Sequence, residues 1–578
     1  MNIPSAEKHY PRISPLLVSE ARAEALRTES LSYLSLTLTK RQLCDLELLM
    51  NGGFAPLTGF MDRAAYESTV AQARLPDGAV WPIPVVLDVS EDFAAKLERG
   101  RKIALRDPEG FMPAALTVTD IWQPDKTREA EQVYGTSRDN HPGVRYLYDQ
   151  VGSVYVGGDL EGIQLPTHYD FESLWDTPEE LRHRFRKLGW RRIIGFHSSN
   201  PMHRLHRELF LQQAKEHQAN ILLHPAVGET KPGDLHYYAR VHCYQALCGH
   251  FPHGMAELSL LPLAMRMAGP REALWHAIVN GNYGCTHFMV GPDHASPPPT
   301  AEGPEEYYGK YEAQEYVKKF ASEIGIEILA TPELRYVPEK KKFLPDHEIL
   351  ASGLESTAIT NTQLKSLLVQ KQEIPDWFSY PEVLALLRRV YPPRDRQGIT
   401  IFFTGLSGSG KSTLANIIFA KLVEFGSRPV SLLDGDIVRQ NLSSELGFSR
   451  AHRNLNIRRI GFVASEVTKN GGVAICAPIA PYRETRDAVR ELIEEHGSFI
   501  EIHVSTPLEV CEARDRKGLY AKARKGIIPE FTGISDPYEV PETPELRIDT
   551  SELAPAEAGQ EILLYLLKEG YLEQDEDF

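Results

Sequence analysis

The residues best suited to chemistry stand in a glycine-rich segment, residues 405–413, which reads GLSGSGKST. The segment fits the phosphate-loop pattern GxxxxGK[ST] and lies between an apolar run (399–403) and a helical pattern (414–425). Glycines let the backbone turn so that amide groups converge on phosphate, where the helix dipole adds positive potential. The predicted nucleotide-binding residues are Gly405, Leu406, Ser407, Gly408, Ser409, Gly410, Lys411, Ser412 and Thr413.

Within that loop, Lys411 supplies a charge for the β- and γ-phosphates, and the Ser412 hydroxyl can ligate Mg²⁺. A second polar set, Asp434, Asp436 and Arg439, follows the apolar run PVSLL. We expect it at the carboxyl edge of a parallel sheet, where ligands bind in open α/β folds. A carboxylate there can position Mg²⁺ or accept a proton from an attacking hydroxyl, and an arginine invites a second anion.

Two cationic stretches follow in the sequence. In LGFSRAHRNLNIRRIG, Arg453 and Asn456 are three residues apart, so a helix would place them on one face. The alternative interpretation is a solvated basic helix. The stretch KGLYAKARKGIIPEFTG combines cations, glycines and Phe531, which is typical of a lid that closes over phosphates.

Another candidate site lies in GFHSSNPMHRLH, residues 195–206. Asn200 is predicted to cap a helix whose first residue is Pro201, leaving the helix N-terminus for phosphate. His203 and His206 would share a face of that helix and could donate to phosphate oxygens. The histidine pair alone is a weak signal, because zinc sites usually add a third ligand.

Composition sets outer limits on function. The 578 residues exceed one core, so three or four domains are expected, and 42% hydrophobic with 25% charged residues is typical of a globular protein. No apolar run approaches the ~18 residues of a membrane span, and no signal peptide is recognised. Six scattered cysteines suit a reducing cytoplasm, and a net charge of −16 argues against nucleic-acid binding.

The order of patterns predicts an α/β multidomain protein. Short β-rich runs fill residues 1–165, whereas helices alternate with buried strands over residues 166–331. A smaller α/β segment spans 332–390, a proline-rich linker spans 391–398, and a final α/β unit spans 399–578.

The last unit resembles adenylylsulfate (APS) kinase, a P-loop family that moves the ATP γ-phosphate to the 3′-hydroxyl of APS. The resemblance rests on GLSGSGKST, DGDIVRQNL, LGFSRAHRNLNIRR, APIAPYRETRD, KGLYAKARKG and FTGISDPYEVPETPEL. It implies Lys411, Asp434 and Asp436 as catalytic residues, with Asp436 aligning or deprotonating the hydroxyl. It also implies Mg²⁺ with ATP as the cofactor and these APS-binding residues: Arg439, Phe448, Arg453, Asn456, Ile479, Lys517 and Phe531.

The first ~390 residues resemble ATP sulfurylase, which joins ATP and sulfate into APS and pyrophosphate. The resemblance rests on LTKRQLCDLELLMNGGFAPLTGFM, NPMHRLHREL, HPAVGETKPGD and LSLLPLAMRMAGPREALWHAIVNGNYGCTHFMVG, among others. It implies a PUA-like β domain (1–165), a Rossmann-like nucleotidyltransferase domain (166–331) and a small C-terminal subdomain (332–390). The nucleotide site it implies comprises Asn200, His203, His206, Gly291, Asp293 and His294.

The sulfate half of that pattern is altered in this sequence. His197 stands where the family has glutamine, and Ser199 and Pro292 stand where it has arginines. Sulfate is a hydrated dianion that needs charge-assisted donors, and losing one such donor typically costs about 10²–10³ in rate. A protonated His197 could replace part of the missing charge, but a lone imidazole near pH 7 is a poor replacement for an arginine.

The sequence therefore predicts an APS kinase whose sulfurylase-like region is inactive or strongly impaired. The alternatives are a working bifunctional enzyme, an N-terminal nucleotide-binding scaffold or regulatory module, and a generic P-loop NTPase. The expected partners are ATP, APS and further copies of the chain in a homo-oligomer, with no nucleic acid and no membrane.

Overall fold

The computed structural model describes residues 15–198, 200–229, 237–297, 306–515, 518–528 and 530–572, except the side chain of Asp436. The chain divides into two compact units. Unit 1 comprises Met1–Ile359 and Pro375–Leu386, and unit 2 comprises Thr360–Ile374 and Leu387–Phe578. The segment 332–390 is thus shared between the units. None of the helices in the described residues combines the length and apolar character that crossing a bilayer requires.

Unit 1 begins with a mainly antiparallel sheet, as the short β-rich runs predict. Its described strands follow the order β1 (Leu34–Thr37), β4 (Lys102–Arg106), β5 (Ala114–Trp122), β6 (Val154–Gly162) and β2 (Gly59–Phe60), with β3 (Leu87–Val89) also paired to β6. The helices of this region are α1 (Glu20–Glu29), α2 (Lys40–Met50), α3 (Arg63–Gln72), α4 (Glu91–Ala94), α5 (Lys126–Glu129) and α6 (Pro142–Asp149).

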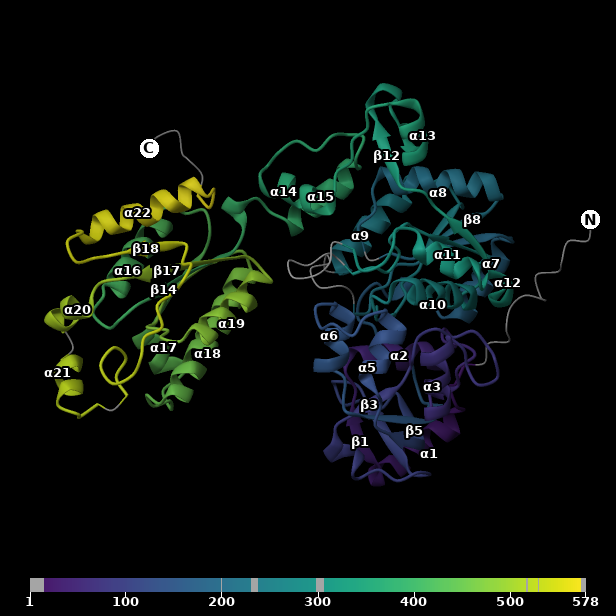
Figure 1. The fold of residues 1–578 in the computed structure, drawn as a ribbon, viewed down its shortest axis with the longest axis horizontal. Helices are drawn as coiled ribbons and strands as arrows, with labels where there is room; N and C mark the ends of the chain where they lie inside the picture. Colours follow the sequence, from purple (N-terminus) through teal and green to yellow (C-terminus); the bar gives the residue numbers. More distant parts are fainter. Residues whose placement is uncertain are drawn as a thin grey trace, which may run out of the picture. The chain divides into compact units, whose positions relative to one another are not determined.

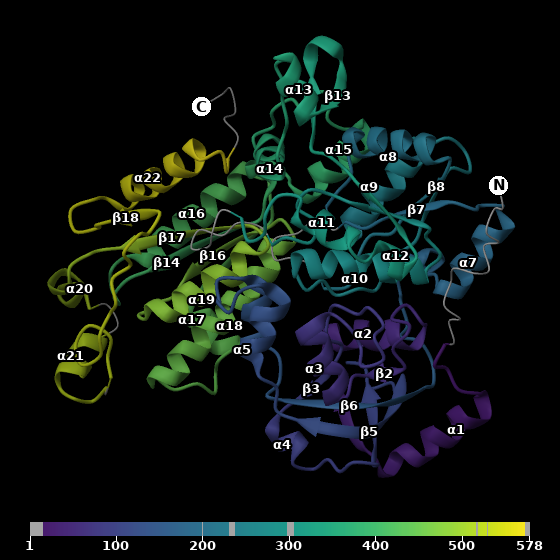
Figure 2. The same cartoon turned by 45° about the vertical axis from the view of Figure 1, so that its right-hand side comes forward.

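A second, parallel sheet confirms the predicted α/β region of unit 1. Its described strands follow the order β11 (Glu327–Ala330), β10 (His287–Val290), β7 (Ile193–Phe196), β8 (Asn220–Leu223) and β9 (Ala256–Leu258). Its helices are α7 (Pro178–Lys187), α8 (Arg204–His217), α9 (Tyr237–Cys248), α10 (Gly269–Asn282), α11 (Glu312–Lys318) and α12 (Ala321–Ile324). Figures 1 and 2 show α8 and α10 on opposite sides of this sheet.

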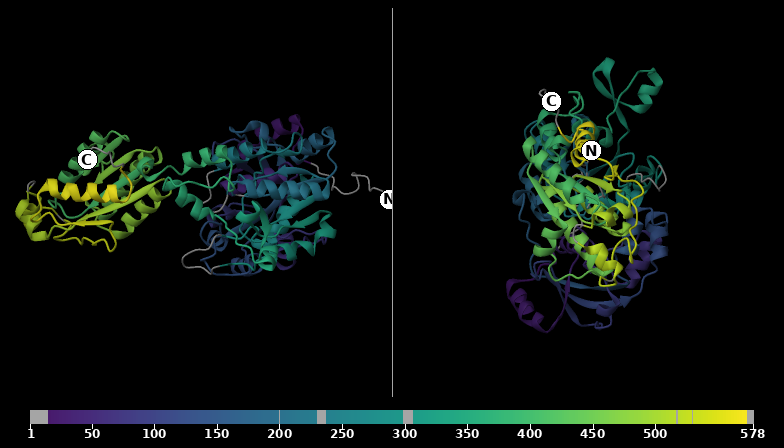
Figure 3. Two further views of the ribbon diagram at one scale, coloured as in Figure 1. Left: turned by 90° about the horizontal axis from the view of Figure 1, so that it is seen from above. Right: turned by 90° about the vertical axis from the view of Figure 1, so that its left-hand side faces the viewer.

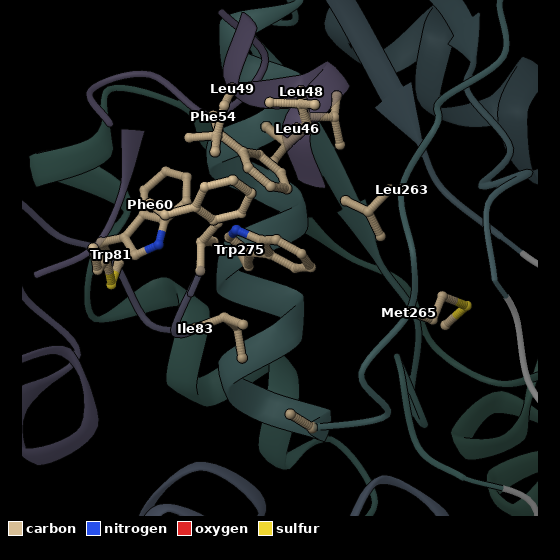
Figure 4. Packing of buried hydrophobic residues seen from close by; sticks show 14 of the residues in the cluster. Leu46, Leu48, Leu49, Phe54, Phe60, Trp81, Ile83, Leu263, Met265 and Trp275 are labelled. Atoms are coloured by element: carbon tan, nitrogen blue, oxygen red, sulfur yellow. The ribbon is translucent and has the colours of Figure 1, made fainter. Parts of the chain in front are cut away.

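The two sheets of unit 1 share one hydrophobic core. Trp275 of α10 packs 5.0 Å, between ring centroids, from Phe54, which in turn lies 5.7 Å from Trp81 (Figure 4). Leu46 and Leu48 of α2 belong to the same fully buried cluster. Because such close packing resists displacement, the second sheet is held firmly on the first.

A small hairpin projects from the rest of unit 1 in Figures 1, 2 and 3. It consists of β12 (Leu334–Val337) and β13 (Lys342–Pro345), followed by α13 (Asp346–Ser352). Tyr336 of β12 stacks on Trp377 with ring centroids 4.6 Å apart, which ties the hairpin to unit 1. Two further helices, α14 (Asn361–Val369) and α15 (Pro381–Val390), lie in the segment shared between the units.

Unit 2 is a second parallel α/β fold. Its described strands follow the order β15 (Val430–Asp434), β16 (Val473–Ala477), β14 (Ile399–Thr404), β17 (Ser498–Val504) and β18 (Leu546–Ile548). Its helices are α16 (Lys411–Phe425), α17 (Gly435–Asn441), α18 (Arg450–Lys469), α19 (Arg483–Glu494), α20 (Leu508–Arg514), α21 (Leu519–Arg524) and α22 (Pro555–Lys568).

Helices cover both faces of the unit 2 sheet because successive strand residues point to opposite sides. Ile399, Ile401 and Phe403 of β14 join one core cluster with α16 and α22, whereas Phe402 joins another with α18 and α19. Figure 1 shows these two helix pairs on opposite sides of the strands. The predicted strand and helix that flank the glycine-rich loop are confirmed.

Candidate active sites

The glycine-rich loop of unit 2 joins the carboxyl end of β14 to the first turn of α16. Gly405, Gly408 and Gly410 have φ angles of 146°, 79° and 107°, which side chains rarely allow. A Cβ atom on Gly405 would lie 2.5 Å from the Val504 carbonyl oxygen. This backbone path therefore requires glycine at these positions. The loop ends at Gly410, which is the N-cap of α16.

Three side chains from distant parts of unit 2 hold the loop in place. The Thr506 and Thr550 hydroxyls lie 3.1 and 2.8 Å from the Ser409 carbonyl oxygen and donate to it. The Tyr520 hydroxyl donates to the Ser407 carbonyl at 2.8 Å. These three residues could not be found from the sequence, because each lies far from the glycine loop in the chain and belongs to no recognisable motif.

The two chemical groups predicted in the loop lie at its end. The buried Lys411 ammonium donates to the Leu406 carbonyl oxygen at 2.7 Å, inside the loop. The Ser412 hydroxyl donates to Asp434 Oδ1 at 3.2 Å, and Asp434 also accepts from the Gly435 amide as the N-cap of α17. A hydroxyl and a carboxylate side by side are the oxygen donors that Mg²⁺ prefers.

Arg453 and Asn456 lie on the same helix, α18, and both are buried, as the three-residue spacing predicts for one face. Arg453 Nη1 donates to the Thr532 hydroxyl at 2.7 Å and pairs with Asp536 at 2.9 Å. Within the described residues, Arg453 Nε and Nη2 and Asn456 Oδ1 are buried without a hydrogen-bond partner. A buried guanidinium with unsatisfied donors is suited to a bound anion.

The remaining predicted residues of unit 2 are spread over several elements. The Arg439 guanidinium lies 4.4 Å from the ring centre of Phe448, which is 62% exposed. Phe531 packs edge-on against Tyr520, with centroids 5.1 Å apart. The Ile479 carbonyl accepts from the Thr404 hydroxyl at 2.7 Å. Lys517 and the Asp436 side chain lie outside the described residues.

A cavity of about 520 Å³ adjoins the loop, lined by Leu406 and residues 533–538. Asp536, one of its lining residues, accepts from the Tyr482 hydroxyl at 2.7 Å in addition to pairing with Arg453. Burial raises the pKa of Tyr482 to about 12, so its hydroxyl remains a donor. The volume lies within the range of small-molecule sites. Asp536 was not predicted as a functional residue, although the stretch that contains it, FTGISDPYEV, carries part of the family resemblance.

In unit 1, the predicted residues gather at the carboxyl edge of the second sheet. His197 follows β7, and residues 291–294 follow β10. His224, which was not predicted from the sequence, follows β8 at the same edge. Carboxyl ends of parallel strands form the ligand-binding edge of such folds. The position of these residues in the fold is therefore that of a ligand-binding site. Their chemistry is a separate question.

His197 is buried, with 3% of its surface exposed, and its ring lies 3.9 Å from that of His276. Neither ring nitrogen has a hydrogen-bond partner among the described residues. Burial, then the neighbouring His276, His294 and His224, hold the pKa of His197 well below its usual value. This environment disfavours the imidazolium, which agrees with the interpretation that His197 is a poor replacement for the missing charge.

The segment after β10 is tied to α10 and α11. His294 Nε2 lies 2.9 Å from Nδ1 of His276, whose Nε2 is 3.3 Å from Glu272. The Pro292 carbonyl accepts from the Tyr311 amide at 2.9 Å, whereas Asp293 is exposed. A Cβ atom on Gly291 would meet nothing within 4 Å, so the backbone there borders open space.

The predicted helix start at Asn200 and Pro201 is wrong. Helix α8 begins at Arg204 with His203 as its N-cap, and the His203 amide donates to His206 Nδ1 at 3.1 Å. The Tyr244 hydroxyl donates to the carbonyls of Ser198 and Asn200, which holds this stretch out of the helix. Ser199 lies outside the described residues.

Both histidines of this segment are neutral and engaged within the protein. His203 Nδ1 lies 2.9 Å from the Ser379 hydroxyl, and its ring is 4.4 Å from Phe378. Burial lowers the pKa of His203 to about 3 and that of His206 to about 4. Burial therefore disfavours the charged form of both imidazoles.

The glycine loop with Lys411, at the carboxyl edge of a parallel sheet, makes unit 2 a P-loop nucleotide-binding fold. Unit 1 contains a parallel α/β domain with a polar carboxyl edge, which follows a β domain in the chain. Comparison with known families agrees. The PUA-like domain family matches residues 6–165, ATP-sulfurylase matches 172–390, and adenylylsulphate kinase matches 397–549.

Whole-chain relatives carry the same combination. Proteins named sulfate adenylyltransferase from Phaeosphaeria nodorum and Mycosarcoma maydis are each 48% identical, covering 98% and 96% of this chain and 99% and 98% of theirs. A solved structure described as a hexameric APS kinase from Thiobacillus denitrificans is 42% identical with a TM-score of 0.79, covering 98% of this chain and 99% of its own. The chain belongs to the family that joins an ATP-sulfurylase domain to an APS kinase domain.

Proposed function

We propose that unit 2 transfers the γ-phosphate of ATP to the 3′-hydroxyl of APS. The observation that carries this proposal is the pairing of two anion sites in one unit. The glycine loop with Lys411 suits the ATP phosphates, and the buried Arg453, with two unsatisfied nitrogens among the described residues, suits a second anionic substrate.

In this mechanism the loop amides and Lys411 stabilise charge on the transferring phosphoryl group. Mg²⁺, when bound, neutralises phosphate charge, and the adjacent Ser412 and Asp434 oxygens would hold it. Asp436 accepts the proton as the 3′-oxygen bonds to phosphorus, the bond to the β-phosphate oxygen breaks, and ADP leaves. The assigned APS contacts are Arg439, Arg453 and Asn456 for the phosphosulfate and ribose, and Phe448 and Phe531 for adenine. Ile479 and Lys517 are also assigned to APS binding.

The direct test measures ADP formation by the full chain, with APS and Mg²⁺ each supplied or withheld. ADP should form only when both are present. Equal ADP formation without APS would instead identify a generic NTPase.

We further infer that unit 1 makes little or no APS from ATP and sulfate. This inference is supported by the buried neutral His197 and by Pro292, which has no backbone N–H. Sulfate then lacks the charge-assisted donors that compensate for its lost hydration. Mass action at high sulfate can offset weak binding but not a misplaced attacking oxygen.

The competing function is a working bifunctional enzyme, and the relatives named sulfate adenylyltransferase favour it. Sulfate-dependent pyrophosphate release from ATP distinguishes the two. Little or no release, beside normal APS-dependent ADP formation, supports the impaired site. Release at a rate comparable to the kinase reaction supports the bifunctional enzyme.

The solved protein from Thiobacillus denitrificans is described as hexameric, and we propose that this chain also forms a homo-oligomer. Unit 1 would then serve as a scaffold or nucleotide-binding module for the kinase. Light scattering of the full chain measures this, and a monomer at micromolar concentration would contradict it.

A further inference from the structure

A cluster of three metal-ligating side chains lies outside both candidate active sites. It consists of His217, His287 and Glu327, and their ligand atoms all lie within 4.8 Å of one another. His287 Nε2 is 3.2 Å from Glu327 Oε2, and His217 Nδ1 is 3.8 Å from Glu327 Oε1. Ligand atoms around a tetrahedral cation with bonds of ~2.0–2.2 Å lie at comparable separations, so small adjustments would suffice.

The cluster occupies the opposite edge of the sheet from the nucleotide-type residues. His287 is the first residue of β10, Glu327 is the first residue of β11, and the two are direct partners in the parallel ladder. His217 is the last residue of α8, which returns the chain to this amino edge. Since His197 and residues 291–294 follow the strands, the cluster is separate from that site.

An outer hydrogen bond orients one of the imidazoles. His287 Nδ1 lies 2.7 Å from the Thr286 hydroxyl oxygen, which also accepts from the Ile193 amide and donates to the Ile193 carbonyl. With a cation on its Nε2, His287 would carry its proton on Nδ1 and donate it to this hydroxyl oxygen. Outer partners of this kind fix the tautomer of metal-binding histidines.

Burial and charge around the cluster are compatible with a cation. The His287 side chain is 8% exposed, that of His217 is 23% exposed, and that of Glu327 is 61% exposed, which leaves room for water as a further ligand. Arg192 is a positive charge near the cluster and would repel a bound cation. Its guanidinium is turned to the backbone, where Nη1 donates to the His217 carbonyl oxygen at 3.0 Å.

We propose that His217, His287 and Glu327 bind one Zn²⁺ or a similar first-row divalent cation. Two imidazoles and a carboxylate favour such ions over Mg²⁺ and Ca²⁺, which prefer oxygen ligands alone. The bound ion would join the end of α8 to the starts of β10 and β11 and so stabilise unit 1. Its position at the amino edge assigns it no part in either group-transfer reaction.

The test uses the full chain, freed of metal with a chelator and titrated with Zn²⁺ without nucleotide. Calorimetry should give one saturable site that His217→Gln and Glu327→Gln weaken at least about tenfold, because even outer partners of a metal ligand typically contribute 10–100-fold. His253→Gln, an exposed histidine outside the cluster, is the matched control and should bind normally. The Glu327 side chain is exposed enough for its substitution to leave folding intact.

A second readout is independent of the calorimetry. Zn²⁺ should raise the thermal midpoint of unit 1 in the parent chain and the control, but not in Glu327→Gln, because a ligand stabilises the state that binds it. Absence of a saturable site, or equal Zn²⁺ affinity in the parent chain and in Glu327→Gln, would overturn the proposal.

Discussion

The carboxyl edges of the two parallel sheets differ in the charge of their side chains. In unit 2 this edge holds Lys411, Asp434 and, nearby, Arg453, each hydrogen-bonded or paired with polar groups. In unit 1 the corresponding edge holds His197 among other histidines, with a pKa depressed by burial. Two similar frameworks thus offer different chemistry, because a sheet edge sets positions while side chains set the electrostatics.

The two edges also differ in how their polar groups are held in position. Hydroxyls of Thr506, Thr550 and Tyr520 fix the phosphate loop from outside by donating to its carbonyls. His197 instead packs on the ring of His276, and its own ring nitrogens have no hydrogen-bond partner among the described residues. Preorganised donors are what stabilise charge in a transition state, so the comparison predicts catalysis in one unit and its loss in the other.

The largest expected effect comes from removing the central cation of unit 2. Lys411→Ala should lower APS-dependent ADP formation by about 10²–10³ or more, because the transferring phosphoryl group loses a fixed charge. The exposed Lys421 on the same helix pairs with Glu424, and Lys421→Ala is the control that should keep its rate. If Lys411→Ala retains more than about a tenth of the parent activity, the site is misassigned.

Next in size are changes that separate chemistry from binding in unit 2. Asp436→Asn should lower kcat about 10²-fold, with a smaller effect on the KM for APS, because it removes the assigned proton acceptor. Arg453→Ala should instead raise that KM about 10–100-fold through a lost charge-assisted contact. Arg458→Ala, at an exposed position on the same helix, is the control.

Steady-state kinetics with varied APS distinguishes these roles. Exchanged profiles for Asp436→Asn and Arg453→Ala would refute them while leaving the kinase assignment intact. Arg453 also pairs with Asp536, so the variant's thermal midpoint should be measured to separate lost binding from lost folding.

The sequence predicted the framework of both edges better than their local detail. The strand before the glycine loop and the helix after it follow directly from an apolar run and the motif. The start of α8 was wrong because Tyr244, more than 40 residues away, holds the carbonyls of Ser198 and Asn200. Local capping rules contain no such tertiary contact.

The protonation state of His197 could not be predicted either. It depends on burial beside His276, His294 and His224, which come from three other segments. Asp536 and Thr550 were missed for a similar reason, since only the fold brings them to Arg453 and to the phosphate loop. Residue types indicate possible chemistry, but the dielectric environment of each group is a property of the packed protein.

A gain of function in unit 1 would sharpen the comparison further. The triple change His197→Gln, Ser199→Arg and Pro292→Arg restores the family's residue types at the altered positions. If the defect is local, sulfate-dependent pyrophosphate release should rise at least about tenfold, a fraction of the 10²–10³ that one such donor contributes. APS-dependent ADP formation should stay unchanged, which serves as the internal control. Robust release by the parent chain would contradict the idea outright.

The smallest expected effect concerns stability rather than rate. Burial lowers the pKa of His141 and of His224 in unit 1 to about 4 and that of His203 to about 3, against about 6.5 in an unfolded chain. Between pH 6.5 and 4 the unfolded chain therefore binds more protons than the folded unit, so unit 1 loses stability as the pH falls.

For one histidine with a pKa of about 4, this linkage amounts to about 2 kcal/mol at pH 5. Glu129 opposes part of the loss, because burial raises its pKa to about 6 and its protonation favours the folded state. All six tryptophans (Trp81, Trp122, Trp175, Trp190, Trp275 and Trp377) belong to unit 1, so their fluorescence reports the unfolding of that unit alone.

Urea unfolding followed by tryptophan fluorescence should give a lower free energy of unfolding for unit 1 at pH 5 than at pH 7. His224→Gln removes one proton-binding group that is buried against Asn280, so the difference between the two pH values should shrink by about 2 kcal/mol. Substituting His253, which is exposed, should leave the difference unchanged. An unfolding free energy of unit 1 that is the same at both pH values would mean that these histidines are not held neutral, and the contrast between the two sheet edges would lose its electrostatic basis.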